Sequence, residues 1–357
     1  MVRFPRIRAL LPFALSWVPA GCAPDGPDRT PKTEPLAESA SIAPVTLRFS
    51  AFTTAREAYE KRIIPLFVEQ WRRSKGQVIR FDQSYGASGA QVQAILDGFE
   101  ADIAVLSNEE DVERLVHSRL VRSDWQWGES HGIVSRSVVV LAVRQGNPRG
   151  VRDWSDLPRP GLRLVLPDPS SSGGGRWGIT AMYGAALRGA GHERTVNLAV
   201  AESFLARVLP RVVRWSPTAR ESFEAFEQGL GDVAITSESE VMRSRMFGHE
   251  VDWVVPRSTL RMDNPAVVVD VYAERHGLAS IARAFLDFLV SEEAQRAFAL
   301  RGFRRVVPLP AAGGADPAKP EVDLWGIEDL GGWPRVREDL FGPGAAFDRA
   351  RATARDD

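Results

Sequence analysis

An α/β fold with a mostly parallel sheet is predicted by three observations. Short apolar runs alternate with longer amphipathic stretches along the chain, as strands alternate with helices. A glycine-rich turn, Pro167-Asp-Pro-Ser-Ser-Ser-Gly-Gly-Gly-Arg-Trp177, joins an apolar run to an amphipathic stretch. The residues that follow an N-terminal segment number roughly 310, which is long for one hydrophobic core and suits two domains or lobes.

The first residues have the layout of a secretory signal. Residues 1–8 contain three arginines, residues 9–18 are apolar, and Pro19-Ala-Gly-Cys22 ends the apolar run. This run is too short to span a bilayer as a permanent helix. We therefore predict a signal peptide over residues 1–21 and export of the mature chain to the periplasm or cell envelope.

Cys22 is the single cysteine of the chain, so an internal disulfide is impossible. Its position after Ala20-Gly21 resembles the lipobox of bacterial lipoproteins, although Pro19 stands where that motif usually has leucine. We predict lipidation of Cys22; the alternative is ordinary cleavage after Ala20, which leaves a soluble exported protein. Residues 22–44 are rich in Pro, Asp, Thr, Glu and Ser and are predicted to form a tether without a core of its own.

A first series of elements is expected between residues 45 and 143. The segment 55–74 places apolar side chains on one helical face, at Tyr59, Ile63, Leu66, Phe67 and Trp71. Further helices are expected at 91–98 and 109–118, and strands at 45–52, 78–83, 102–106 and 137–143.

A second series follows Gly146-Asn-Pro-Arg-Gly150. Strands are expected at 162–166, 232–235 and 252–255, with a further extended run at 266–271. Helices are expected at 177–187, 198–209, 220–229 and 278–300. The alternation of both series predicts helices packed on a sheet.

Three turns rich in backbone donors follow strands and precede helices: Ser84-Tyr-Gly-Ala-Ser-Gly89, the turn at 167–177, and Ser216-Pro-Thr-Ala-Arg220. Unpaired amides and the positive end of a helix dipole converge at such a junction and favour an anion. Ligands of open α/β sheets bind beyond the carboxyl ends of the strands, so the three turns can surround one small anion. The patterns of nucleotide-binding loops are absent from the sequence.

Seven motifs are similar, in order and near-matching spacing, to those of a known family, the periplasmic sulfate-binding proteins of bacterial ABC importers. They are Ala55-Arg-Glu-Ala-Tyr59, Gln83-Ser-Tyr-Gly-Ala-Ser-Gly89, Gly98-Phe-Glu-Ala-Asp-Ile103, Val143-Arg-Gln-Gly-Asn-Pro148, the turn at 167–177, Gly229-Leu-Gly-Asp-Val233 and Gly331-Gly-Trp333. The resemblance extends from about residue 45 to residue 348.

The resemblance implies a two-lobed type II periplasmic-binding-protein fold with two hinge crossovers. Residues 45–142 and 258–357 would form lobe I, and residues 143–257 lobe II. It further implies a monomer that captures sulfate or thiosulfate for an ABC transporter permease, without catalysis, cofactor or metal. Contact with the membrane would be made by the lipid anchor alone.

Ligand-binding residues are implied by the same resemblance. The matching positions are Ser88 or its neighbour Ala87, together with Ser172, Gly173, Gly174 and Ala219. Backbone amides would make most of the contacts, and the Ser172 hydroxyl would add a donor. Arg176 and Arg220 are expected behind these residues, where they would orient the loop and spread charge.

The sequence departs from the family at three places. Ser237 stands where the family has an indole donor to the anion, Thr53-Thr-Ala-Arg56 replaces Asp-Pro-Thr-Arg, and Glu221 replaces a small residue. An indole only donates a hydrogen bond, whereas a hydroxyl donates or accepts. A pocket with an acceptor could take a protonated anion, so other tetrahedral oxyanions such as phosphate, molybdate or tungstate are the alternative ligands.

An exported serine hydrolase is the rival interpretation. Gly86-Ala-Ser-Gly-Ala90 follows a predicted strand and resembles a nucleophile elbow with Ser88 exposed, although Ala90 stands where that motif has glycine. His249 or His276 would then have to act as the base. The net charge of −1, from 45 Lys and Arg against 46 Asp and Glu, argues against a nucleic-acid partner.

Overall fold

The computed structural model describes residues 43–189, 197–307 and 322–356. The predicted signal peptide, residues 22–42 of the tether and the lipidation site Cys22 lie outside the described residues. Residues 42–357 form one compact unit. Among the described residues no helix is both long and apolar enough to cross a bilayer.

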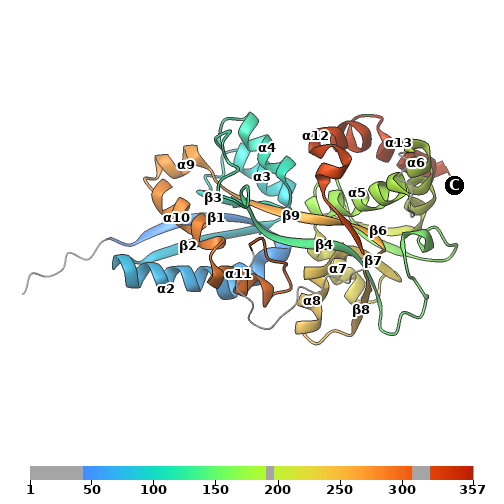
Figure 1. Cartoon of the computed structure of the whole chain (residues 1–357), viewed down its shortest axis with the longest axis horizontal. Helices are drawn as coiled ribbons and strands as arrows, with labels where there is room; N and C mark the ends of the chain where they lie inside the picture. Colours follow the sequence, from blue (N-terminus) through green and yellow to red (C-terminus); the bar gives the residue numbers. More distant parts are fainter. Residues whose placement is uncertain (1–42, 190–196, 308–321, 357) are drawn as a thin grey trace, which may run out of the picture. The chain divides into compact units, whose positions relative to one another are not determined.

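In the described part of the chain, ten strands form one sheet with helices on both faces (Figure 1). The strand order is β2-β1-β3-β9-β4-β7-β5-β6, while β10 pairs with β9 and β8 with β4. The strands are β1 Val45–Phe52, β2 Ile79–Gly86, β3 Ile103–Val105, β4 Ile133–Arg144, β5 Leu164–Pro167, β6 Val212–Ser216, β7 Val233–Ser237, β8 Val251–Val254, β9 Ser258–Val268 and β10 Asp323–Trp325.

The α-helices enclose this sheet. They are α1 Arg56–Ala58, α2 Ile64–Lys75, α3 Ser88–Leu96, α4 Glu109–His117, α5 Gly173–Arg188, α6 Leu198–Val208, α7 Ala219–Glu227, α8 Glu238–Met246, α9 Asp270–Arg275, α10 Ala279–Leu289, α11 Glu292–Ala299, α12 Gly332–Val336 and α13 Ala346–Asp356. The α/β fold class predicted from the sequence is confirmed.

Two long strands, β4 and β9, connect the halves of the sheet. They pair with each other in antiparallel fashion; the first part of β4 lies against β9, and its second part lies against β7 and β8. The far end of β9 pairs with β3. The expected parallel pairing therefore holds for the flanking strands and for β10 with β9. By contrast, β4 pairs antiparallel with β7, β8 and β9, and β9 pairs antiparallel with β3.

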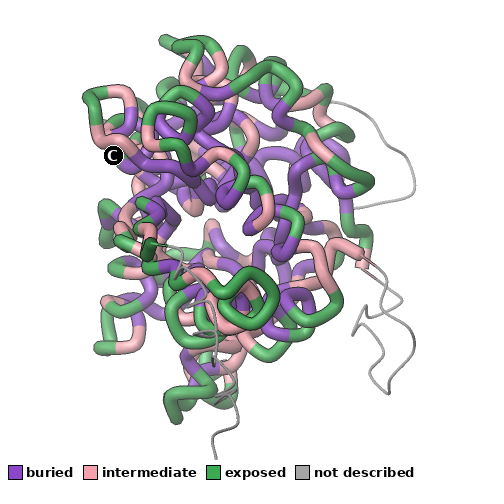
Figure 2. Tube along the Cα trace, turned by 90° about the vertical axis from the view of Figure 1, so that its left-hand side faces the viewer, coloured by how far each residue is buried: buried purple, intermediate pink, exposed green. Residues whose placement is uncertain are grey.

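Separate hydrophobic cores lie on either side of these two strands. One contains Phe49, Tyr59 and Phe285, and we call the part built on it, with β1–β3, α1–α4 and α9–α11, the first lobe. The other contains Leu164 and Trp177, and we call the part with β5–β8, β10, α5–α8, α12 and α13 the second lobe. Buried positions lie inside both parts, and exposed ones on the outer helices and loops (Figure 2).

The C-terminal segment packs with the second core. Trp325, Trp333 and Phe347 all belong to it, and the rings of Trp177 and Trp333 lie 4.8 Å apart, edge to face. The sequence analysis placed this segment with lobe I, whereas its buried side chains contact the other core. The cause is a tertiary contact: α13 packs against α6, which belongs to the second lobe.

Several element boundaries differ from the predictions for physical reasons. The helix predicted at 278–300 is two helices, because Ser291 caps α11 by accepting a hydrogen bond from the Ala294 amide. The extended run expected at 266–271 is the end of the longer strand β9, which stops at Val268. Strand β6 was not predicted; it lies at one edge of the sheet, and its exposed side chains give no clear apolar run.

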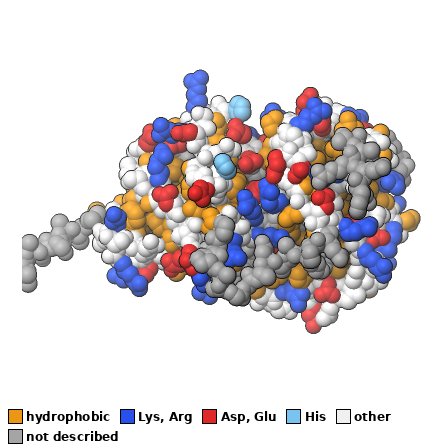
Figure 3. All heavy atoms as spheres, in the orientation of Figure 1, with side chains coloured by type: hydrophobic (Ala, Val, Ile, Leu, Met, Phe, Trp, Pro, Cys, Tyr) orange, Lys and Arg blue, Asp and Glu red, His pale blue; other side chains and the backbone are white. Residues whose placement is uncertain are grey.

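Charges of both signs are interspersed on the face drawn in Figure 3. This agrees with the near-balanced composition of the chain. Selection of an anion therefore has to depend on a local arrangement of donors.

Candidate anion-binding site

One small cavity brings together all seven residues predicted to bind the ligand. It lies between the two lobes and is lined by Ala87, Ser88, Ser172, Gly173, Gly174, Ala219 and Ser237, among others. Its volume is about 30 Å³. Cavities for drug-sized ligands measure roughly 300–1,000 Å³, so this one suits an ion of a few atoms.

Four helices begin at the cavity. Ser88 is the first residue of α3, Gly173 of α5 and Ala219 of α7, while Ser237 caps α8. Among the described residues, the amides of Ser88, Gly173, Gly174 and Ala219 donate to no protein acceptor. Free amides and the positive ends of helix dipoles therefore point to one place, which is the electrostatic environment that an anion needs.

The first turn of α5 requires glycine. A Cβ atom on Gly173 would lie 2.6 Å from the Ser107 Cβ, and one on Gly174 would lie 2.8 Å from the Ala219 Cβ. Both distances are far shorter than van der Waals contact, so any side chain here would push the walls apart. Ser172 precedes these glycines, and its hydroxyl does not cap α5. That hydroxyl is buried in the cavity wall and is available to a ligand.

The Ser88 hydroxyl is engaged by the protein. It donates to Asp111 Oδ2 at 2.6 Å and accepts from the Ser107 amide at 2.9 Å. Burial raises the pKa of Asp111, although the hydrogen bond from Ser88 opposes the rise. The backbone amide of Ser88, rather than its hydroxyl, is thus the group left for an anion.

The hydrolase hypothesis finds no support in this arrangement. Neither His249 nor His276 lines the cavity, and His276 instead contacts Asp102 at 2.7 Å and Glu100 at 3.0 Å. Beside its hydroxyl Ser88 has the Asp111 carboxyl group, where the hydrolase hypothesis requires a histidine as the base. Among the described residues no group of three or more His, Cys, Asp and Glu side chains could hold a metal ion.

Ser237 has a structural role that the sequence analysis missed. Its hydroxyl oxygen caps α8 by accepting from the Glu240 amide at 3.3 Å, and it lies 3.0 Å from the Ser239 hydroxyl. Ser237-Glu-Ser-Glu240 has the Ser-x-x-Glu spacing of a helix start, which was the available signal. Ser237 therefore stabilises a helix and lines the cavity at the same time.

Among the described residues no Lys, Arg, His, Asp or Glu side chain lines the cavity. Arg176 and Arg220 lie behind it and are paired with carboxylates of the first lobe. Arg176 contacts Glu110 and donates to the Pro169 carbonyl oxygen at 3.1 Å, so it holds the glycine-rich loop. The anion would face neutral donors, with the arginine charges one layer further out.

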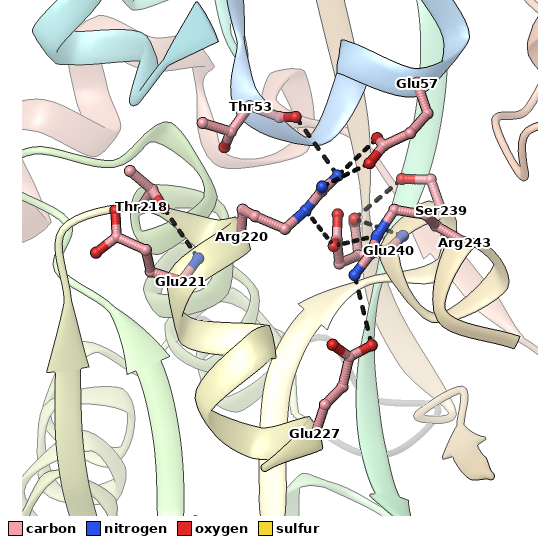
Figure 4. A network of polar contacts seen from close by, with 10 residues as sticks. Thr53, Glu57, Thr218, Arg220, Glu221, Glu227, Ser239, Glu240 and Arg243 are labelled. Carbon is pink, nitrogen blue, oxygen red and sulfur yellow. Dashed lines mark hydrogen bonds and ion pairs between the residues drawn. The ribbon is translucent and has the colours of Figure 1, made fainter. Parts of the chain in front are cut away.

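Arg220 lies in a wider ionic network (Figure 4). Its Nη atoms donate to both carboxylate oxygens of Glu57, and its Nε lies 2.7 Å from Glu240, which also pairs with Arg243. Burial alone would raise the pKa of Glu57, but the Arg220 guanidinium outweighs it and lowers that pKa. Burial raises the pKa of Glu240, which has two arginines opposing the rise.

Other lining residues were not predicted from the sequence. Those with polar side chains are Thr53, Thr54, Ser107, Ser137, Thr236, Ser239 and Asn264. Thr53 and Ser107 follow strands β1 and β3, so the rule that ligands bind at carboxyl ends could have found them. Ser107 also joins the lobes, because its carbonyl oxygen accepts from Trp177 Nε1 at 2.7 Å and from Asn264 Nδ2 at 3.0 Å.

Comparison with known proteins identifies relatives that are named for binding a solute or an oxyanion. Residues 47–304 match the family described as bacterial extracellular solute-binding protein. A sulfate-binding protein of Synechococcus elongatus is 36% identical over 86% of this chain and 87% of its own length. A thiosulfate-binding protein of Pseudomonas aeruginosa is 31% identical over 84% of this chain and 90% of its own length. The structure of the sulfate-binding protein SubI of Mycobacterium tuberculosis superposes with a TM-score of 0.72 at 33% identity and covers 84% of this chain and 100% of that one.

Proposed function

Since this chain belongs to the family of bacterial extracellular solute-binding proteins, we propose that it captures sulfate, or thiosulfate, for an ABC importer. The relatives named for these two anions cover most of the chain, which supports an oxyanion as its ligand. The lipid anchor at Cys22 and a location in the periplasm or cell envelope are part of the proposal.

The observation that carries this proposal is the convergence of four helix starts on a cavity that no charged side chain of the described residues lines. A dianion there is bound by the amides of Ser88, Gly173, Gly174 and Ala219 and by the Ser172 hydroxyl. Each of these residues already lines the cavity in the folded protein, so little reorganisation opposes binding. Hydrogen bonds to an ionised ligand are about twice as strong as neutral ones, which offsets the loss of the ion's hydration.

Closure of the two lobes around the anion is the mechanism that we propose. Strands β4 and β9 join the lobes and act as the hinge. The pairs Arg220–Glu57 and Arg176–Glu110 connect the second lobe to the first, which supports their formation on closure. Binding and closure are then linked, because a ligand that contacts both lobes favours the closed state.

The protein acts as a monomeric binding protein and catalyses no reaction. Its relatives are named for the anions that they bind, and the engaged hydroxyl of Ser88 supports a role without nucleophilic catalysis. The anion is handed to a permease in the membrane. The alternative ligands are other tetrahedral oxyanions, since Ser237 stands in the cavity wall.

Calorimetric titration of the purified mature protein tests the proposal. We expect one site per chain for sulfate or thiosulfate, with phosphate, molybdate and tungstate titrated in parallel. Small-angle scattering should show compaction at saturating ligand. The absence of binding heat for every oxyanion, with identical scattering profiles, would contradict the proposed function.

A further inference from the structure

Three serine hydroxyls form one wall of the cavity. Ser137 lies on β4, Ser237 ends β7, and Ser239 lies in the first turn of α8. All three line the cavity and are buried, with exposed fractions of 2%, 8% and 4%. We call this group the serine wall.

The hydrogen bonds within the serine wall leave part of its capacity unused. The Ser239 amide donates to the Ser137 hydroxyl oxygen at 3.2 Å, and the Glu240 amide donates to that of Ser237. One hydroxyl hydrogen lies between Ser237 and Ser239, whose oxygens are 3.0 Å apart. In the described structure the other two hydroxyl hydrogens have no protein acceptor, and lone pairs also remain open because each hydroxyl oxygen has two.

The backbone amides around the cavity behave differently. The free amides of α3, α5 and α7 can only donate, so they favour an oxygen that carries no proton. Hydroxyls rotate, and the serine wall can present either a hydrogen or a lone pair to the ligand. A carboxylate in the same place would repel a fully ionised anion, but among the described residues none lines the cavity.

We propose that the serine wall allows this site to bind singly protonated tetrahedral oxyanions, such as hydrogen phosphate, in addition to fully ionised ones such as sulfate. This inference rests on the proposed function, because it concerns the same cavity. The amides hold three bare oxygens, and the fourth oxygen faces the serine wall. When that oxygen is protonated it donates to a serine oxygen, and when it is bare it accepts a serine hydrogen. Ser137 and Ser239 are thus specificity-determining residues.

The experiment compares two tetrahedral dianions, of which one carries a proton and the other does not. At about pH 8 most inorganic phosphate is a dianion with one proton, and sulfate is a dianion with none. Both are titrated calorimetrically into the wild type, Ser137→Ala, Ser239→Ala and the control Ser172→Ala. Selenate and arsenate repeat the comparison at a larger radius. Ser237 is kept unchanged because it caps α8.

We expect the wild type to bind both sulfate and phosphate. In Ser137→Ala or Ser239→Ala, the affinity for phosphate should fall by a factor at least about ten times larger than the factor for sulfate. The reason is that the proton of hydrogen phosphate loses its acceptor. In Ser172→Ala, both anions should weaken by similar factors, because this hydroxyl donates to either. Thermal unfolding reports whether each variant is folded, and Ser239→Ala serves if Ser137→Ala does not fold.

Two results would overturn the inference while the proposed function stands: sulfate binding with no phosphate binding, or phosphate binding that the serine-wall substitutions reduce no more than sulfate binding. Absence of binding for every anion would instead overturn the proposed function and the inference with it.

Discussion

Arg220 and Glu57 are joined by two hydrogen bonds of 2.7 and 2.8 Å that connect the two lobes behind the cavity, although the residues lie 163 positions apart in the sequence. Arg220 belongs to the first turn of α7, next to Ala219, which lines the cavity. Glu57 belongs to α1 of the first lobe. The pair therefore links one of the anion-binding turns directly to the opposite lobe.

We expect Glu57→Gln to weaken sulfate binding by increasing the population of the open form. The loss should be about 1–2 kcal/mol, or roughly fivefold to thirtyfold in Kd, because the pair is largely buried and Arg220 keeps Glu240 as a partner. Calorimetry measures the affinity, and small-angle scattering measures the open population. Glu69→Gln, which removes an exposed carboxylate paired with Arg72 and Arg73, is the control and should leave both unchanged. Equal affinities for wild type and Glu57→Gln would show that the pair does not bias closure.

Gly174→Val should abolish anion binding. Its side chain would begin 2.8 Å from the Ala219 Cβ, so the starts of α5 and α7 could not approach one ligand together. Calorimetry with sulfate checks the affinity, and circular dichroism checks that helical content is retained. Gly342→Ala is the matched control, because a Cβ there lies no closer than 3.3 Å to any neighbour. Unchanged affinity in Gly174→Val would move the site away from this turn.

The raised pKa of Glu109 predicts that the stability of the folded protein falls as pH rises. Burial, followed by the charges of Asp263 and Glu328, raises its pKa from 4.5 to about 7. The folded state therefore binds more protons than the unfolded state between these values, so this residue lowers stability as pH rises from about 4.5 to about 7. Glu109→Gln should raise the melting temperature at pH 8 and leave it nearly unchanged at pH 4.5.

The control for this pH effect is Glu293→Gln, which removes an exposed carboxylate from the first turn of α11. Differential scanning calorimetry of the three proteins at both pH values gives the comparison. An equal change in melting temperature for Glu109→Gln at pH 4.5 and pH 8 would contradict the assigned titration.

The glycine-rich turn at 167–177 shows which features of the site the sequence predicts and which it does not. Its composition pointed to an anion site, but α5 begins at Gly173, four residues before the predicted start at Trp177. Glycine has low helix propensity, so the sequence favours a loop there. The close packing of Gly173 against Ser107 and of Gly174 against Ala219 accompanies the earlier start, and those neighbours are distant in sequence.

The serine wall could not be predicted in the same way. Ser137 reaches the cavity because β4 pairs with β9 and β7 in one particular register. A shift of one residue would turn its side chain to the other face of the sheet. The Arg220–Glu57 pair likewise depends on the packing of the two lobes, so the resemblance to the family identified Arg220 but not its partner.

A matched pair of substitutions separates the two roles of Ser237, which caps α8 and lines the cavity. Ser291 caps α11 in the same manner and lies away from the cavity lining. Ser237→Ala and Ser291→Ala should each lower the free energy of unfolding by about 1 kcal/mol through loss of a cap. Calorimetry should show altered anion affinity for Ser237→Ala and not for Ser291→Ala, since of these two residues only Ser237 lines the cavity. If neither variant changes the affinity, Ser237 is a helix cap and nothing more.

Restoring an indole at this position is the stronger test of how the cavity is filled. The resemblance to sulfate-binding proteins suggested that Ser237→Trp would either add a donor or overpack the closed form. The cavity measures about 30 Å³ and Ser237 is buried against Ser239, so we expect overpacking together with the loss of the α8 cap. Sulfate affinity and melting temperature should both fall, and scattering should show the open form at saturating sulfate. Tighter sulfate binding by Ser237→Trp would instead show that the serine wall moves to make room for the indole and that the closed cavity repacks around it.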